Sequence, residues 1–220
     1  MSADHVQVGW KCEVRARFWE PGTEEHVRRK LYLPAGAHVS AAMLDRLKVR
    51  PFRVAEGPTP GNRLTSAGLA AMTSQWISGT KDWAVSSGGS GWTGLAVGNG
   101  TTADAIGDTD LVGATKSYRV CDNGFPKRVG ATSSGTGAVL TSGQFELGAT
   151  FASGEANHAW DEYGGLVPNS SASAATGAAT TSKAAFGGGN YILLNRKAPA
   201  GLGTKTAGSP AELYMVLTIS

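Results

Sequence analysis

The residues from Val6 to Phe18 alternate between apolar and polar side chains, and this pattern constrains the fold more than any other feature of the chain. One set of alternate positions is apolar or small, and it comprises Val6, Val8, Trp10, Cys12, Val14, Ala16 and Phe18. Successive side chains of a β-strand point to opposite faces of a sheet, whereas those of a helix repeat about every 3.6 residues. The pattern therefore predicts a long strand with one buried face.

A turn and a returning strand are expected to follow this first strand. The stretch from Glu20 to Glu24 contains Pro and Gly and is typical of a turn, and Val27 to Leu33 is predicted as the second strand of a β-hairpin. A ribbon of two strands is not stable by itself in water. Its apolar face must therefore pack on the rest of the chain or on another subunit. We predict that this anchoring or interface face consists of Val6, Val8, Trp10, Val14 and Phe18.

The rest of the chain is predicted to be mainly β, an antiparallel β-sandwich with one or two short helices. Short helices are expected from Ser40 to Lys48 and from Leu64 to Ile77, the second capped by Thr65 or Ser66. Apolar strand patterns separated by Gly-rich turns follow at 92–97, 118–121, 139–151, 191–195 and 213–219. The predicted organisation is a basic anchoring region at 1–55, a linker at 56–63 and a sandwich body at 64–220, with a flexible low-complexity insert at 169–190.

Charge and cysteine content narrow the function classes. The first 66 residues carry a net charge of +4 and the remainder −1, but the basic residues are mixed with Glu13, Glu20, Glu24 and Glu25. This mixture favours a solvated face or a protein contact over a nucleic-acid track. The two cysteines form no disulfide framework or metal motif, and no signal peptide or membrane-spanning run is found, so we expect synthesis in a cytoplasm without secretion. The 31 glycines fit a turn-rich β-protein.

No group of residues predicts catalysis, a cofactor or a metal. His158 with Asp161 and Glu162 lacks convergent ligand spacing, and polar positions on a strand or turn are favoured for these residues. The aspartates of Asp104 to Asp110 do not match a calcium loop, so a turn or capping role is favoured for them. The Gly98–Gly100 turn has no phosphate-loop signature, and Cys12 is predicted to be a core residue. Glu146 and Glu155 are candidates for the paired carboxylates of a glycosidase, but positions on the face of a strand are favoured for them.

Five segments follow one another in an order that points to a known group of proteins: LTSAGLAAMTSQW, LAVGNGTTADAIGDTDL, FELGATFASGEANHAWDEYGGL, ILLNRKA and KTAGSPAELYMVLTIS. This series resembles a domain of tailed-bacteriophage structural proteins. It departs from that domain at Asp104, where the family has Pro, and at Tyr163-Gly164. The resemblance implies a virion component of the neck, collar, tail, fibre or capsid surface that forms a homo-oligomer, often a trimer, with other virion proteins as partners. It implies no enzyme activity.

Two other functions remain open from the sequence. Trp83 and Trp92 lie among Gly and Ser residues and are the aromatic side chains most suited to contact a host glycan or receptor, which would make the chain a binding module of the tail. Core or interface packing is nevertheless favoured for these two residues. A virion-associated glycan hydrolase is the third reading, and it requires convergent carboxylates in a cleft.

Overall fold

The computed structural model describes residues 10–57, 63–78, 93–122, 125–128, 144–168, 178–186 and 191–219. Three helices occur among these residues: α1 (Thr23–Lys30), α2 (Ala41–Arg46) and α3 (Ser66–Ser78). The strands are β1 (Trp10–Phe18), β2 (Arg53–Glu56), β3 (Arg63–Leu64), β4 (Gly94–Gly98), β5 (Lys116–Val120), β6 (Lys127–Arg128), β7 (Gln144–Phe151), β8 (Glu162–Pro168), β9 (Tyr191–Lys197) and β10 (Ala211–Ile219).

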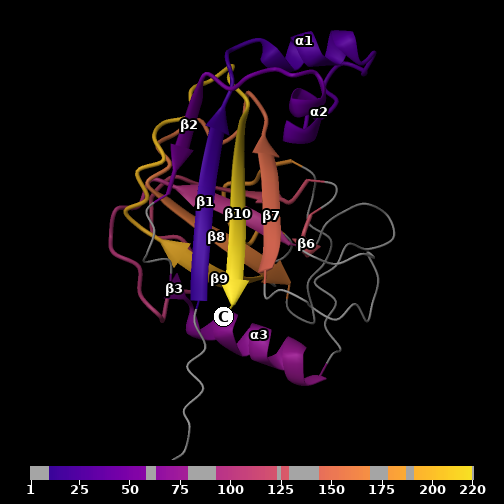
Figure 1. Cartoon of the computed structure of the whole chain (residues 1–220). Helices are drawn as coiled ribbons and strands as arrows, with labels where there is room; N and C mark the ends of the chain where they lie inside the picture. Colours follow the sequence, from indigo (N-terminus) through magenta and orange to yellow (C-terminus); the bar gives the residue numbers. More distant parts are fainter. Residues whose placement is uncertain are drawn as a thin grey trace, which may run out of the picture.

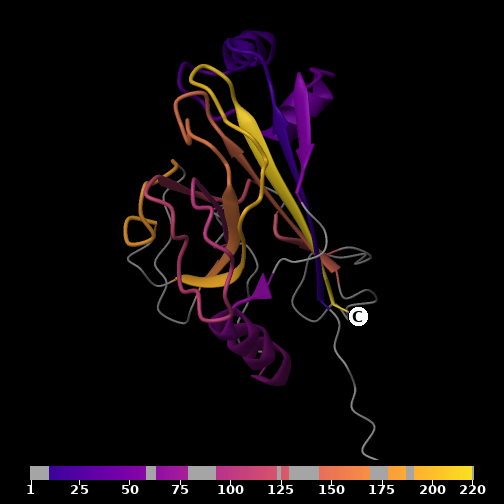
Figure 2. The ribbon, with the colours of Figure 1, turned by 90° about the vertical axis from the view of Figure 1, so that its left-hand side faces the viewer.

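The strands form two antiparallel sheets that lie face to face. Sheet A has the order β2-β1-β10-β7-β6, and sheet B has the order β3-β9-β8-β4-β5. Figure 1 shows α1 and α2 at one end of the molecule and α3 at the other, and Figure 2 shows the two layers from the side. The prediction of a mainly β, antiparallel sandwich with short helices is confirmed.

Strand β1 forms as its alternation predicts. It lies between β2 and β10, and its inward residues Cys12, Val14, Ala16 and Phe18 are at most 5% exposed, while Lys11, Glu13 and Arg15 face outward. The inward set packs with residues of both sheets, and the Trp160 ring lies 5.2 Å from that of Phe18 and 5.3 Å from that of Phe151.

The predicted anchoring face is therefore part of the core where the structure describes it. Val14 and Phe18 are not available for docking, because the opposite sheet covers them. The backbone of Trp10 pairs with Ile219 at the start of β1. Val6 and Val8 lie outside the described residues, so the prediction is untested there.

The predicted hairpin is wrong, because the segment after the turn is the helix α1 and not a returning strand. Its sequence has no period of two, and Val27 is its only large apolar residue. Glu24 and Glu25 occupy the first turn and three basic residues the last turn, which matches the helix dipole. The partner strands of β1 are instead β2 and β10, which come from distant parts of the sequence.

The predicted division of the chain does not follow the sheets. Strands β1 and β2, from the predicted anchoring region, share sheet A with β7 and β10 of the predicted body. The helical part of that region, α1 and α2, has a small apolar cluster of its own with Trp19, Val39 and Leu44 at 0% exposure. In the low-complexity insert, the described stretch 178–186 packs on sheet B: Thr180 pairs with Tyr118, and Phe186 is fully buried.

Helix α1 ends in a left-handed residue that is not glycine. Tyr32 has a φ of 54°, its N–H donates to the Arg29 carbonyl, and the N–H of Leu33 donates to the Arg28 carbonyl. This is the Schellman arrangement, in which glycine is favoured because a Cβ is strained there. The Tyr32 side chain is 95% exposed, so packing does not offset the strain.

Replacing Tyr32 with glycine is expected to raise the free energy of unfolding by about 1 kcal/mol. The matched control is Lys30→Gly, which puts glycine inside the same helix and is expected to lower that free energy by about 1 kcal/mol. Urea unfolding followed by circular dichroism measures both. A loss of stability in Tyr32→Gly would mean that the aromatic side chain makes a contact worth more than the strain.

Candidate functional site

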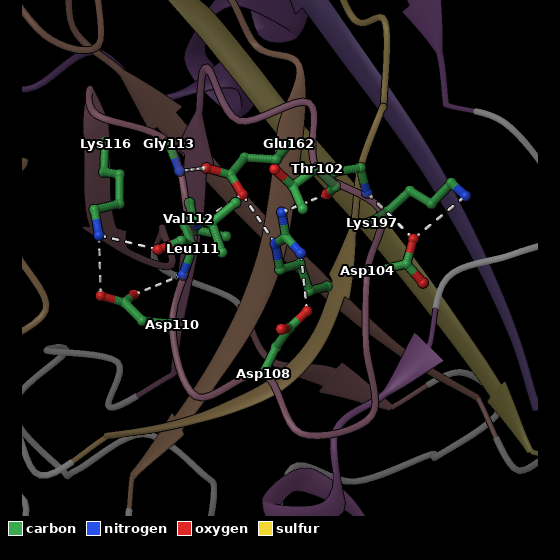
Figure 3. A network of polar contacts seen from close by, with 12 residues as sticks. Thr102, Asp104, Asp108, Asp110, Leu111, Val112, Gly113, Lys116, Glu162 and Lys197 are labelled. Carbon is green, nitrogen blue, oxygen red and sulfur yellow. Dashed lines mark hydrogen bonds and ion pairs between the residues drawn. The ribbon is translucent and has the colours of Figure 1, made fainter.

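The loop between β4 and β5 is held to sheet B through one buried carboxylate. Glu162, the first residue of β8, is 0% exposed. Its Oε1 accepts a hydrogen bond from the Gly113 N–H at 2.6 Å, and its Oε2 accepts one from the Val112 N–H at 3.0 Å. The Arg196 Nε donates to the same Oε2 at 2.9 Å. Figure 3 shows Glu162 facing the loop. The charge of this carboxylate is thus balanced by a cation and two backbone donors.

Arg196 on β9 links Glu162 to the other half of the loop. Its side chain is 1% exposed, and Nη1 lies 2.8 Å from the Asp108 Oδ2 while Nη2 donates to the Thr102 carbonyl at 2.8 Å. Burial disfavours the charged guanidinium, but the hydrogen bonds to Asp108 and Glu162 outweigh it and raise the pKa of Arg196. The guanidinium therefore stays charged and binds two carboxylates and a carbonyl group at once.

Each aspartate of the loop pairs with a different cation. Asp108 binds Arg196, Asp104 lies 3.5 Å from the Lys197 Nζ, and Asp110 lies 3.3 Å from the Lys116 Nζ. Asp108 also accepts the Ala105 N–H at 2.8 Å, which is the turn role predicted for these residues. In Figure 3 the three aspartates lie along the loop and face different partners. They do not converge as calcium ligands.

The glycines of this loop allow the close approach of Glu162. A Cβ on Gly100 would lie 2.6 Å from the Glu162 Oε1, and one on Gly113 would lie 2.7 Å from the same atom. Non-bonded atoms do not approach this closely, so a side chain at either position would displace the Glu162 carboxylate. The Gly98–Gly100 turn therefore packs against the carboxylate of Glu162. We call Glu162, Arg196, Asp108 and the backbone groups that they bind the loop clamp.

A second polar network joins the helical end of the molecule to the sheets. Arg119 on β5 is 3% exposed and forms an ion pair with Glu155, and its Nη2 lies 2.8 Å from the His38 Nδ1. The other ring nitrogen of His38 lies 3.0 Å from an oxygen of Asp122. The Ala41 N–H, at the start of α2, donates to the Thr150 Oγ at 2.8 Å. The network fixes the α1–α2 region to strands of both sheets.

The remaining predicted candidates are not brought together. Glu155 binds Arg119 and the N–H groups of Ala152 and Ala179, whereas Glu146 forms a side-chain hydrogen bond with Tyr214. The two glutamates therefore do not form an acid–base pair. His158 contacts Ser117 and not Glu162. Within the described part of the chain, no three His, Cys, Asp or Glu residues are placed to hold a metal ion. The described residues also include no helix of the length and apolarity that a membrane span needs.

Other predicted residues are core residues or lie outside the described part of the chain. Cys12 and Cys121 are both buried and form no disulfide, and burial raises the pKa of the Cys121 thiol to about 12. Trp83 and Trp92 lie outside the described residues, so a glycan-binding role for them remains a prediction. A groove of about 340 Å³ lies along β1, β2 and β10, with Glu13, Arg15, Glu56 and Tyr214 among its lining. No loop-clamp residue lines it.

Arg196 and Lys205 were not predicted as site residues, and Glu162 was expected to be a polar residue of a strand or turn. One sequence pattern does indicate such buried charges: a charged residue lies within or next to an apolar strand, as in YILLNRK of β9 and EYGGLVP of β8. A charge at such a position is buried when the strand forms and requires a partner. The partners lie 34 and 88 residues away, so local spacing could not identify them.

The buried charged residues described above lie within the consecutive sequence segments that resemble parts of bacteriophage structural proteins. Asp108, Glu162 and Arg196 come from three of those segments, and Lys205 begins a fourth. All of them hold loops of the sandwich in place. Comparison of the chain with protein-family models, curated proteins and solved structures found no match.

Proposed function

We propose that the chain is a structural subunit of a tailed-bacteriophage virion that acts through protein–protein assembly, as a fibre, neck or collar, or capsid-decoration protein. In this role it is a homo-oligomer, with a trimer expected from the resemblance, and its partners are other virion proteins. The observation that carries the proposal is the loop clamp, because its residues Asp108, Glu162 and Arg196 lie in the phage-like segments and hold the loop between β4 and β5.

A fixed loop suits an assembly subunit. A loop that is already ordered loses little conformational entropy when a neighbouring subunit binds it, so more of the contact energy appears as affinity. The clamp orders the stretch from Thr102 to Gly113 through bonds at both of its ends. The same stretch presents Ile106 and Val112, which are 59% and 48% exposed. Large apolar side chains on a rigid surface loop are suited to contact with another protein.

The test is recovery of the chain with phage particles. Particles of a phage that encodes this chain are purified on a density gradient, and their proteins are quantified by mass spectrometry against the major capsid protein. We expect the chain to band with infectious particles at a fixed copy number relative to the capsid protein. A phage-encoded soluble protein from the same lysate serves as the control for carry-over. Recovery of the chain only in the soluble fraction contradicts the proposal.

A further inference from the structure

Lys205 is a buried lysine whose amino group faces a side-chain amide. The residue lies before β10 and is 1% exposed. Its Nζ lies 2.6 Å from the Asn157 Oδ1 and 3.4 Å from the Ser153 carbonyl oxygen. Neither partner is charged, and Lys205 makes no ion pair with the described residues. Buried lysines are rare unless paired with a carboxylate, so this arrangement calls for an explanation.

A buried carboxylate with one oxygen unpaired belongs to the same group. The Glu24 side chain, on α1, is 4% exposed. Its Oε2 accepts hydrogen bonds from the Ser153 N–H at 3.2 Å and the Ser153 Oγ at 2.6 Å, and it lies 3.4 Å from the Arg28 Nη2. Its Oε1 is buried without a hydrogen-bond partner. Because Glu24 and Lys205 both bind Ser153, the amine, the amide and the unpaired carboxylate oxygen are gathered around one turn.

The surroundings of Lys205 increase the fraction of its neutral form. Burial lowers the pKa of Lys205 to about 8, although the charges of Glu24 and Glu155 act in the opposite direction. A lysine with its ordinary pKa of about 10.4 is almost entirely protonated near neutral pH and has no lone pair for attack. Asn157 is exposed as a residue, so a small molecule released from its side chain has a path to solvent.

We propose that Lys205 and Asn157 react to form an intramolecular isopeptide bond, with Glu24 transferring the proton. The Nζ lone pair of Lys205 attacks the Asn157 Cγ, and the carbonyl π pair moves to Oδ1. Because Glu24 and Nζ form no direct ion pair, the Glu24 carboxylate takes one proton from Nζ through one bridging water. The carbonyl then re-forms, the Cγ–Nδ2 bond breaks, and Nδ2 leaves as ammonia with the proton from Glu24. The products are a secondary amide, ammonia and the regenerated carboxylate, and no oxidant or cofactor is consumed.

The bond would join two parts of the chain that are 48 residues apart. Asn157 follows β7, and Lys205 precedes β10, which is the neighbour of β7 in sheet A. A covalent link here restricts the unfolded chain, as a disulfide does in an oxidising environment. The proposal does not depend on the virion function, since it concerns only residues of this chain.

The intact mass of the purified full-length protein tests the proposal. Release of ammonia lowers the mass by about 17 Da from the sequence value, in the manner of other covalent modifications. Nearly all of the wild-type protein is expected to carry this loss. After proteolysis, tandem mass spectrometry is expected to show one branched peptide that contains both Asn157 and Lys205. Wild-type protein at its full sequence mass overturns the proposal.

Three variants separate this reaction from other losses of ammonia. Asn-Gly pairs such as Asn99-Gly100 and Asn123-Gly124 also lose ammonia when they form a succinimide, without a branched peptide. Lys205→Arg and Asn157→Ala each remove one reacting group and are expected to keep the full mass. Glu24→Gln keeps the shape of the side chain but removes the proton carrier, and it is expected to slow the reaction by at least roughly a hundredfold, the scale of general acid–base catalysis. Loss of ammonia in Lys205→Arg at the wild-type level overturns the proposal.

Discussion

Replacing Arg196 with methionine is expected to lower the free energy of unfolding by about 3–5 kcal/mol, the scale for removing one partner of a buried ion pair. Methionine keeps much of the volume of the side chain and isolates the effect of the charge. The variant leaves Glu162, which is 0% exposed, without its cation, and it removes the Arg196 donors from Asp108 and the Thr102 carbonyl. Urea unfolding at constant pH measures the loss through the shift of the midpoint.

The control for Arg196→Met is a lysine in an exposed ion pair. Lys11 pairs with Glu13 on the outer face of β1, and the two side chains are 61% and 54% exposed. Lys11→Met is expected to change the stability by less than about 1 kcal/mol, because solvent screens such pairs. If Arg196→Met lowers the free energy of unfolding no more than this control does, the buried ion pairs do not hold the loop in place.

The same network can be divided by a double-mutant cycle. Glu162→Gln removes the negative charge, although its amide nitrogen cannot accept the N–H of Gly113 or Val112 as the carboxylate does. The combined variant with Arg196→Met is expected to lose less than the sum of the two single losses, since each single change leaves the other charge unpaired. The size of this coupling reports how far the clamp acts as one unit.

Strands with clear periodicity could be predicted from the sequence, whereas strands rich in glycine could not. Strand β1 was evident because its alternation survives over its whole length. Strand β8 was missed, since Gly164, Gly165 and Pro168 indicate a turn by composition. In the structure those two glycines allow β9 to lie close: a Cβ on Gly164 would be 2.6 Å from the Asn195 carbonyl oxygen, and one on Gly165 would be 2.8 Å from the Asn195 Oδ1. The close approach between the strands, and not the local propensity, determines these residues.

The helix α1 and the polar networks show the other limit of sequence reasoning. A strand was expected for Val27–Leu33 on the assumption that β1 pairs with the next segment of the chain, but β10 supplies that partner from the C-terminus. The loop clamp likewise joins β8, β9 and a loop that lie far apart in sequence. Such contacts depend on the topology of the whole sandwich, which a local pattern does not contain.

Replacing Gly68 with alanine is expected to destabilise the protein, although alanine is the better helix former. Gly68 lies in the first turn of α3, where its N–H donates to the Thr65 Oγ at 2.9 Å, as the predicted N-cap requires. The Thr65 N–H donates to the Leu194 carbonyl at 3.0 Å, so this end of the helix rests directly on β9. Helix propensity alone would favour alanine by about 1 kcal/mol.

Close packing on β9 is expected to outweigh that preference. A Cβ on Gly68 would lie 2.8 Å from both the Cα and the carbonyl carbon of Leu194, and closer still to its oxygen. These are backbone atoms of an interior strand and cannot move aside as a side chain can, so α3 must shift and its cap must loosen. Such overpacking typically costs about 1–3 kcal/mol, and we expect a net loss in this range.

The matched control for Gly68→Ala is an alanine placed where there is space. Gly154 has no atom within 4 Å of a Cβ position and no left-handed φ, so Gly154→Ala is expected to be neutral or to stabilise by up to about 1 kcal/mol through the unfolded chain. Thermal unfolding of both variants at one pH gives the comparison. A gain of stability in Gly68→Ala as large as that in Gly154→Ala would show that α3 does not rest on β9 at this point. In that case α3 and β9 would be farther apart, and helix propensity would determine whether Gly68→Ala raises or lowers the stability.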